Sequence, residues 1–217
     1  LPISSLKTSP ETPVRIYMKD YDANGTLDQV LTTYKNGIAY PFASPDALIQ
    51  QIPSLASRYA TYADFGDSRL DDIFTPDQLR DALVDEVVTF ATTYFENNGE
   101  GTFAARVLPT EAQFAPVYAI LTDDFDDDGH QDLMLAGNFY GVGPRRGRYD
   151  ASYGLLLRGD GQGGFAAVTL ETSHLVVEGQ VRALQPLRHA DGSRLILAVR
   201  NGASLQVFRW RRPFDRP

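Results

Sequence analysis

The sequence contains no cysteine and only three histidines, His130, His174 and His189, each isolated from the others. Without cysteine the chain can form no disulfide, no thiolate zinc site and no cysteine-based catalytic centre. Three separated histidines leave little for a histidine-based transition-metal site. Any metal ligands in this protein are therefore expected to be oxygen atoms.

Motifs of the common hydrolase and nucleotide-binding classes are also missing. The chain has no Gly-x-Ser-x-Gly elbow, no phosphate-binding loop and no His-Glu-x-x-His. The pairs Asp64 with Asp67 and Glu86 with Glu96 have the chemistry of an acid and a base, but nothing in the sequence distinguishes them from surface charge. We therefore expect a protein that is not an enzyme.

Basic residues and long apolar runs are scarce as well. The 217 residues include 20 Lys and Arg against 28 Asp and Glu, a net charge of -8, so nucleic acid is not an expected partner. No run approaches the roughly 20 apolar residues that span a bilayer, and the first ten residues do not resemble a signal peptide. We expect no membrane insertion, and expect any export signal to have been removed or to lie upstream.

Two short acidic stretches stand out in what is present, "KDYDANGTLDQVL" at 19–31 and "TDDFDDDGHQDLML" at 122–135. Each is preceded and followed by a run rich in β-branched and aromatic residues, which is typical of strands. The sequence thus contains an internal repeat in which an acidic loop joins two strands.

Carboxylates gathered in a short loop repel one another unless a cation lies among them. Calcium takes 6 to 8 oxygen ligands, and a loop turned by a glycine offers such ligands from alternate residues. A single acidic Asp-Gly loop is commonly a solvated turn, but two copies in the same context favour two calcium sites. The expected ligands are Asp20, Asp22, Asn24, Asp28 and the Thr26 carbonyl in the first loop, and Asp124, Asp126, Asp128, Asp132 and the His130 carbonyl in the second.

Two other calcium-binding loops are less consistent with this pattern. An EF-hand closes with a glutamate twelve positions along, where this chain has Leu31 and Leu135. A dockerin-like loop leads into a helix, whereas the residues that follow here favour strands.

Further strands are expected after each loop. The segments 91–108 and 151–170 read as hairpins with turns at Asn98-Gly99 and Asp160-Gly161, and Phe103 and Phe165 are expected to pack on the core. Residues 14–43 with 91–108 then form a first four-stranded unit, residues 115–170 a second, and residues 178–212 a partial third without an acidic loop.

Residues 44–90 interrupt the first unit and are expected to be helical. Ser44 before Pro45 is a typical helix start, and Thr75 with Gln78 has the spacing of a capping box. A helix that begins there would align Leu79, Leu83, Val87 and Phe90 on one apolar face. We expect these helices to cover exposed faces or edges of the sheets.

These residues resemble the FG-GAP or VCBS-repeat proteins, whose propeller blades are similar to those of integrin α subunits. "DFDDDGHQD" and "DYDANGTLD" match the family's calcium loop, and "RGDGQGGF" and "NNGEGTF" match its hairpin. The resemblance implies a mainly β fold of four-stranded blades stiffened by calcium, here with a helical insertion. A family propeller normally has seven blades, so we expect the C-terminal part of a larger protein, with its sheets covered by helices, further blades or a second chain.

Two segments are candidate recognition surfaces. Arg158-Gly159-Asp160 spells an integrin-recognition tripeptide, although it falls at the expected hairpin turn. The segment 138–153 combines aromatic and arginine side chains that suit a sugar or an acidic peptide, or is an ordinary connection. Its candidate residues are Tyr140, Arg145, Arg146, Arg148 and Tyr149.

The sequence therefore predicts a calcium-binding, non-enzymatic recognition or adhesion module of a secreted or surface bacterial protein, extracellular or periplasmic. The ligand would be a protein or a carbohydrate. The alternative is a lectin-like domain or an accessory domain of a polysaccharide-processing enzyme.

Overall fold

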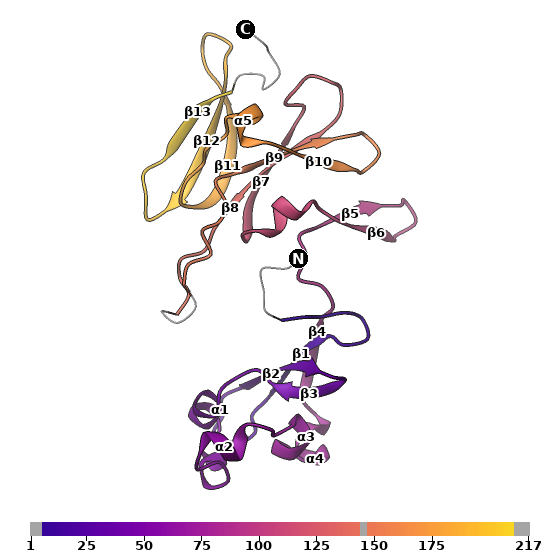
Figure 1. The fold of residues 1–217 in the computed structure, drawn as a ribbon, viewed down its shortest axis with the longest axis vertical. Helices are drawn as coiled ribbons and strands as arrows, with labels where there is room; N and C mark the ends of the chain where they lie inside the picture. Colours follow the sequence, from indigo (N-terminus) through magenta and orange to yellow (C-terminus); the bar gives the residue numbers. More distant parts are fainter. Residues whose placement is uncertain (1–5, 144–146, 211–217) are drawn as a thin grey trace. The chain divides into compact units, whose positions relative to one another are not determined.

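The structure, a computed structural model, describes residues 6–143 and 147–210 and is mainly β. It divides into two compact units, an N-terminal unit up to residue 90 and a C-terminal unit from residue 91 (Figure 1). Across these described ranges the sheets are open, and they form neither a closed barrel nor a propeller. None of the helices described is both long and apolar enough to cross a membrane.

The N-terminal unit contains one four-stranded antiparallel sheet with the order β3-β2-β1-β4. Strand β1 is Val14–Lys19, β2 is Asp28–Lys35, β3 is Ile38–Pro41 and β4 is Leu83–Val87. The first acidic loop joins β1 to β2, which confirms the expected strand–loop–strand arrangement.

The expected helix after Thr75 is wrong beyond its first turn. Helix α4 (Pro76–Arg80) ends at Arg80, and β4 follows and pairs with β1 along its whole length. β-branched residues such as Val84 and Val87 favour a strand, and the edge of β1 offers the backbone partners that complete it. The fourth strand of this sheet is therefore β4, and the hairpin expected from residues 91–108 belongs to the other unit.

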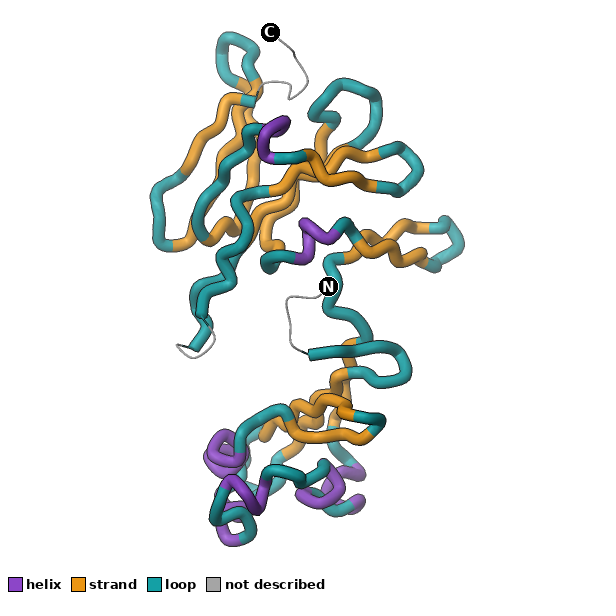
Figure 2. Tube along the Cα trace, viewed as in Figure 1, coloured by secondary structure: helices purple, strands orange, loops and turns teal. Residues whose placement is uncertain are grey.

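Short helices cover this sheet, as the sequence predicts (Figure 2). They are α1 (Pro45–Gln51), η1 (Pro53–Ser57), α2 (Tyr62–Phe65), α3 (Leu70–Ile73) and α4. The start of α1 is confirmed, because the Ser44 side chain accepts a hydrogen bond from the Ala47 N–H, and so is the Thr75–Gln78 capping box. The core between helices and sheet contains Val30, Leu48, Ile52, Tyr59, Phe65, Leu70, Ile73 and Phe74.

The C-terminal unit is organised around a four-stranded antiparallel meander, β10-β9-β8-β7. Its strands are β7 (Val117–Asp123), β8 (Asp132–Gly137), β9 (Leu155–Gly159) and β10 (Phe165–Val168). This is the four-stranded sheet expected from the second repeat, with the second acidic loop between its first two strands.

The two inner strands of this meander, β8 and β9, are buried on both faces. Met134 and Leu156 pack against a three-stranded sheet of β11 (Gln180–Arg188), β12 (Arg194–Asn201) and β13 (Gln206–Arg209). Their neighbours Leu135 and Leu157 point the other way, toward the turn η2 (Thr110–Gln113) and the hairpin of β5 (Thr93–Asn97) and β6 (Phe103–Val107). One further short helix, α5 (Leu170–Ser173), follows β10.

In the C-terminal unit the β5–β6 hairpin and the three-stranded sheet each have an outer face, turned away from the meander, that is apolar and exposed. On the hairpin, Phe95, Phe103 and Val107 share one face and are 57%, 61% and 65% exposed. The expected packing of Phe103 on the core is therefore wrong, whereas Phe165 does pack, with its ring 5.4 Å from that of Tyr94. On the three-stranded sheet, Leu187, Val199 and Val207 are exposed in the same way.

We predict that Leu157→Ala lowers the free energy of unfolding of the C-terminal unit by about 2 to 5 kcal/mol, because Leu157 is fully buried and its loss leaves a cavity. Phe103→Ala, on the exposed outer face, should change it by less than about 0.5 kcal/mol. Denaturant unfolding of both variants checks this. Equal losses would mean that the face bearing Phe103 is covered in solution.

Candidate metal sites

The first acidic loop is folded by hydrogen bonds from its backbone to its own carboxylates. Asp20 accepts from the N–H groups of Asn24 and Gly25, at 3.0 and 2.8 Å. Asp22 also accepts from the Asn24 N–H, at 3.2 Å, and the Asn24 side-chain oxygen accepts from the Thr26 N–H at 2.8 Å. Gly25 has a φ of 85°, a conformation that suits glycine.

The second acidic loop repeats this pattern position by position. Asp124 accepts from the N–H groups of Asp128 and Gly129 at 3.1 and 3.0 Å, and Asp126 accepts from Asp128 at 3.2 Å. Asp128 accepts from the His130 N–H at 2.9 Å, and this bond lowers the pKa of the Asp128 carboxyl. Gly129 has a φ of 89°. The two copies thus share one loop conformation.

A buried aspartate at the start of the following strand closes each loop. Asp28 and Asp132 are 2% and 1% exposed and accept from the N–H groups of Tyr21 and Phe125, both at 2.9 Å. Asp132 accepts a second bond, also at 2.9 Å, from the N–H of Gly159 at the end of β9. Asp132 therefore fastens the loop to the hairpin beside it.

The structure brings together most of the predicted metal ligands. Oxygens of Asp20, Asp22 and Asp28 lie within 4.8 Å of one another in the first loop, and so do those of Asp124, Asp126 and Asp128 in the second. Asp132 is outside this second group and instead accepts the two backbone N–H bonds. Asn24, Thr26 and His130 lie in the loops as expected, where the N–H groups of Thr26 and His130 help to fold the chain.

The second loop contains a buried carboxylate oxygen that suits a cation. The Asp126 side chain is 4% exposed, and its Oδ2 accepts no hydrogen bond from any residue in the described ranges. Burial raises the pKa of this carboxyl. Arg158 Nε lies 2.9 Å from the same oxygen, so a positive charge is already at the position where one is needed. The ligands are oxygens throughout, which is the set that calcium prefers.

All three residues of Arg158-Gly159-Asp160 make contacts within the C-terminal unit. Arg158 contacts the second acidic loop, and Gly159 lies so close to it that a Cβ would approach the Gln131 carbonyl oxygen to 2.1 Å. Asp160 accepts from the N–H groups of Gln162 and Gly164 at 2.7 and 2.8 Å, and these bonds lower its pKa. The tripeptide closes a hairpin turn and supports the loop.

The aromatic and arginine segment is only partly available for recognition. Phe139 and Tyr149 pair as a β-bridge, and the Arg148 guanidinium lies 4.9 Å from the centre of the Tyr140 ring. Arg148 thus occupies one face of the ring on which a sugar was expected to stack. Arg145 and Arg146 lie outside the described residues.

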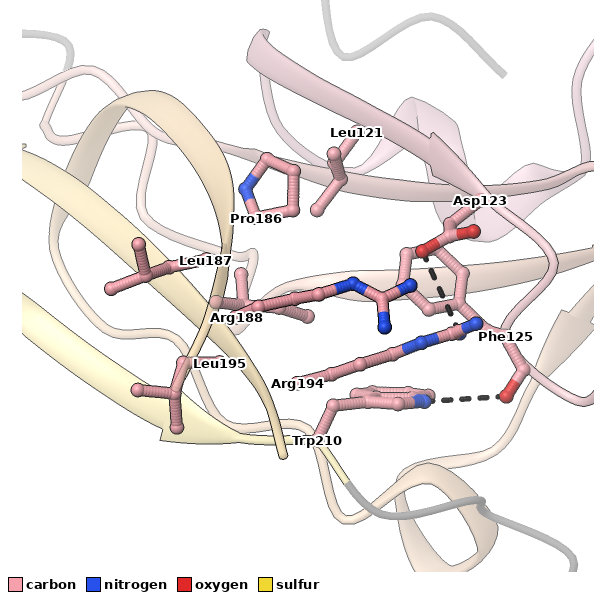
Figure 3. A pocket seen from close by; sticks show the side chains of 10 residues that line it. Leu121, Asp123, Phe125, Pro186, Leu187, Arg188, Arg194, Leu195 and Trp210 are labelled. Atoms are coloured by element: carbon pink, nitrogen blue, oxygen red, sulfur yellow. Dashed lines mark hydrogen bonds and ion pairs between the residues drawn. The ribbon is translucent and has the colours of Figure 1, made fainter. Parts of the chain in front are cut away.

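A pocket of about 300 Å³ lies beside the second loop in the C-terminal unit (Figure 3). Arg188, Arg194 and the Trp210 indole are stacked in it, and Arg194 contacts Asp123 at 3.6 Å. The Trp210 indole N–H donates to the Phe125 carbonyl at 3.2 Å. This pocket has no signature in the sequence, because residues 121–125 and 186–210 that line it are about 60 to 90 positions apart and no local pattern joins them.

Three of the four carboxylates considered for catalysis have structural partners. Glu86 pairs with Arg15 and Glu96 with Arg106. Asp64 caps helix α2. No protein-family model, curated protein or solved structure matches the chain. Function is therefore inferred from the site residues themselves.

We predict that Asp132→Asn destabilises the C-terminal unit even in a chelator, by about 1.5 to 3 kcal/mol, because an amide has one oxygen where Asp132 uses two charged ones. Thermal unfolding in EDTA measures this. Asp150→Asn, at an exposed position of the same unit, is the control and should have no effect. Equal stability of the two variants would contradict the role of Asp132 in closing the loop.

Proposed function

We propose that this chain is a calcium-stabilised, non-enzymatic recognition module built from propeller-type blades. The observation that supports it is the identical hydrogen-bond pattern of the two acidic loops, each placed between the first two strands of a sheet. A solvated turn needs no such repetition of carboxylates around a common centre.

Calcium would be held by the oxygens of Asp20, Asp22, Asn24 and Asp28 in one loop and of Asp124, Asp126 and Asp128 in the other, with the Thr26 and His130 carbonyls as further ligands. Bound there, the ion neutralises the mutual repulsion of the carboxylates and restrains the loop. The backbone N–H groups already orient Asp20 and Asp124 without it.

The packing of the C-terminal unit supports propeller-type blades. A meander whose inner strands are buried on both faces is characteristic of a sheet stacked between neighbours, and the outer faces of the two flanking sheets are themselves apolar. Side chains such as Phe103 and Val207 suit contact with further sheets of the same kind. Such contacts would come from a longer protein or a second chain.

An extracellular or periplasmic location of a secreted or surface protein follows from the same chemistry. Loops with calcium dissociation constants in the millimolar range are filled where calcium is abundant, as it is outside cells.

Titration calorimetry with calcium should show two sites in the intact chain. Asp22→Ala should remove the first and Asp124→Ala the second, because each deletes a carboxylate of one cluster. Asp67→Ala, on the exposed surface of the N-terminal unit, should leave both sites intact. If both sites survive in Asp22→Ala and in Asp124→Ala, the assignment is wrong.

Calcium should also raise the stability of each unit. Binding to the folded state alone adds about 2.7 kcal/mol at a hundredfold excess over Kd. Asp22→Ala should abolish the gain in the N-terminal unit and Asp124→Ala that in the C-terminal unit. An identical melting temperature with calcium and with EDTA would argue that the loops are solvated turns.

A second candidate function, recognition of an acidic carbohydrate, is favoured by the pocket of Figure 3. The Arg188 side chain forms no hydrogen bond or ion pair within residues 6–143 and 147–210, so its guanidinium can donate to a carboxylate of a ligand. The Trp210 ring and the adjacent leucines offer an apolar surface to the body of a sugar.

A glycan array tests this second function. The chain should retain oligosaccharides of hexuronic acids and not the corresponding neutral hexose oligomers. Arg188→Gln should lose that binding, while Arg209→Gln, an exposed arginine outside the pocket, should keep it. Absence of selective binding to these oligosaccharides would contradict this second function.

A further inference from the structure

The two acidic loops differ at one ligand position. Where the first loop has Asn24, the second has Asp128. At the predicted ligand positions the first loop therefore has three carboxylates, those of Asp20, Asp22 and Asp28. The second loop has four, of which Asp132 faces the backbone N–H groups of Phe125 and Gly159. An additional carboxylate strengthens both the attraction for a cation and the repulsion in its absence.

Arg158 compensates for this extra charge. It lies at the end of β9, next to Gly159, whose N–H donates to Asp132, so its side chain is directed over the second loop. Its guanidinium is 2.9 Å from Asp126 Oδ2 and 3.2 Å from Asp128 Oδ2. Arg158 thus places one positive charge against the carboxylate at position 128 that the first loop does not have.

We propose that Arg158 is an internal competing cation that weakens calcium binding at the second site and stabilises its metal-free loop; this inference rests on the proposed function. Asp126 is 4% exposed, and Arg158 contacts the one oxygen of that carboxylate that accepts no hydrogen bond in the described chain. An ion entering the loop must displace the guanidinium from that oxygen, so the lost contact is subtracted from the binding free energy.

Arg158 could either compete with calcium or orient the carboxylates that bind it. The direction in which the calcium affinity changes when Arg158 is removed distinguishes the two roles. If Arg158 competes with calcium, its removal raises the affinity of the second site, by up to about fivefold for a partly exposed ion pair. If Arg158 instead orients Asp126 and Asp128 for the metal, its removal lowers that affinity.

The test is calcium calorimetry on Arg158→Gln, with Arg106→Gln as the matched control. Arg106 is equally exposed and also pairs with a carboxylate, Glu96 at 2.6 Å, but lies outside both loops. Arg158→Gln should tighten the second site and leave the first unchanged, while Arg106→Gln should alter neither. An unchanged or weaker second site in Arg158→Gln overturns the inference, and absence of calcium binding by the unmodified chain overturns the proposed function as well.

Unfolding in EDTA gives a readout that does not depend on calcium. Arg158→Gln should melt at a lower temperature than Arg106→Gln, since Asp126 and Asp128 then lose the positive charge beside them. Adding Asp128→Asn to Arg158→Gln should restore part of the loss, because it reproduces the charge of the first loop. If Arg158→Gln is as stable in EDTA as the control, the guanidinium does not compensate the loop and the inference is wrong.

Discussion

Backbone N–H groups, more than any contact between side chains, determine the form of the acidic loops. Each loop points several N–H donors at its own carboxylates, so that Asp20 and Asp124 each receive two of them. Carboxylates held this way keep their positions against mutual repulsion, since each charged oxygen is stabilised locally by a hydrogen bond. The strands on either side, the turn at glycine and the buried aspartate that closes the loop all follow from this constraint.

Much of this arrangement could be predicted because it is local. Runs rich in β-branched and aromatic residues indicated the strands around the loops, and the Thr75–Gln78 spacing indicated a helix start. The predictions that were wrong concern residues whose structure depends on partners far away in the sequence. Leu79, Leu83 and Val87 have the spacing of a helical face, yet Leu83–Val87 is a strand because β1, about 70 residues earlier, offers it an edge. Similarly, Phe103 and Phe165 occupy equivalent hairpin positions, and only Phe165 has a sheet to pack against.

In the candidate site, too, the local features could be predicted from the sequence and those that depend on distant residues could not. Its ligands follow one another in the chain and were predicted from spacing alone, whereas the cation beside them comes from Arg158, 30 residues after Asp128. The tripeptide around Arg158 suggested adhesion, but the register of β9 against β8 turns its side chain toward the acidic loop. A short motif has no fixed meaning until the strand pairing around it is known.

The second loop lies where two sheets meet, so a cation bound there would act beyond the loop. Gly159 of β9 donates to Asp132 from one side, and from the other Arg194 of β12 donates to the Asp124 carbonyl at 3.2 Å while Trp210 donates to the Phe125 carbonyl. Restraining the loop therefore restrains the meander and the three-stranded sheet together. The first loop has different neighbours, since Tyr21 packs against Phe74 after α3 and Lys19 donates to the Gln78 carbonyl in α4. Two loops of one conformation thus stabilise different contacts, sheet to sheet in one unit and sheet to helix in the other.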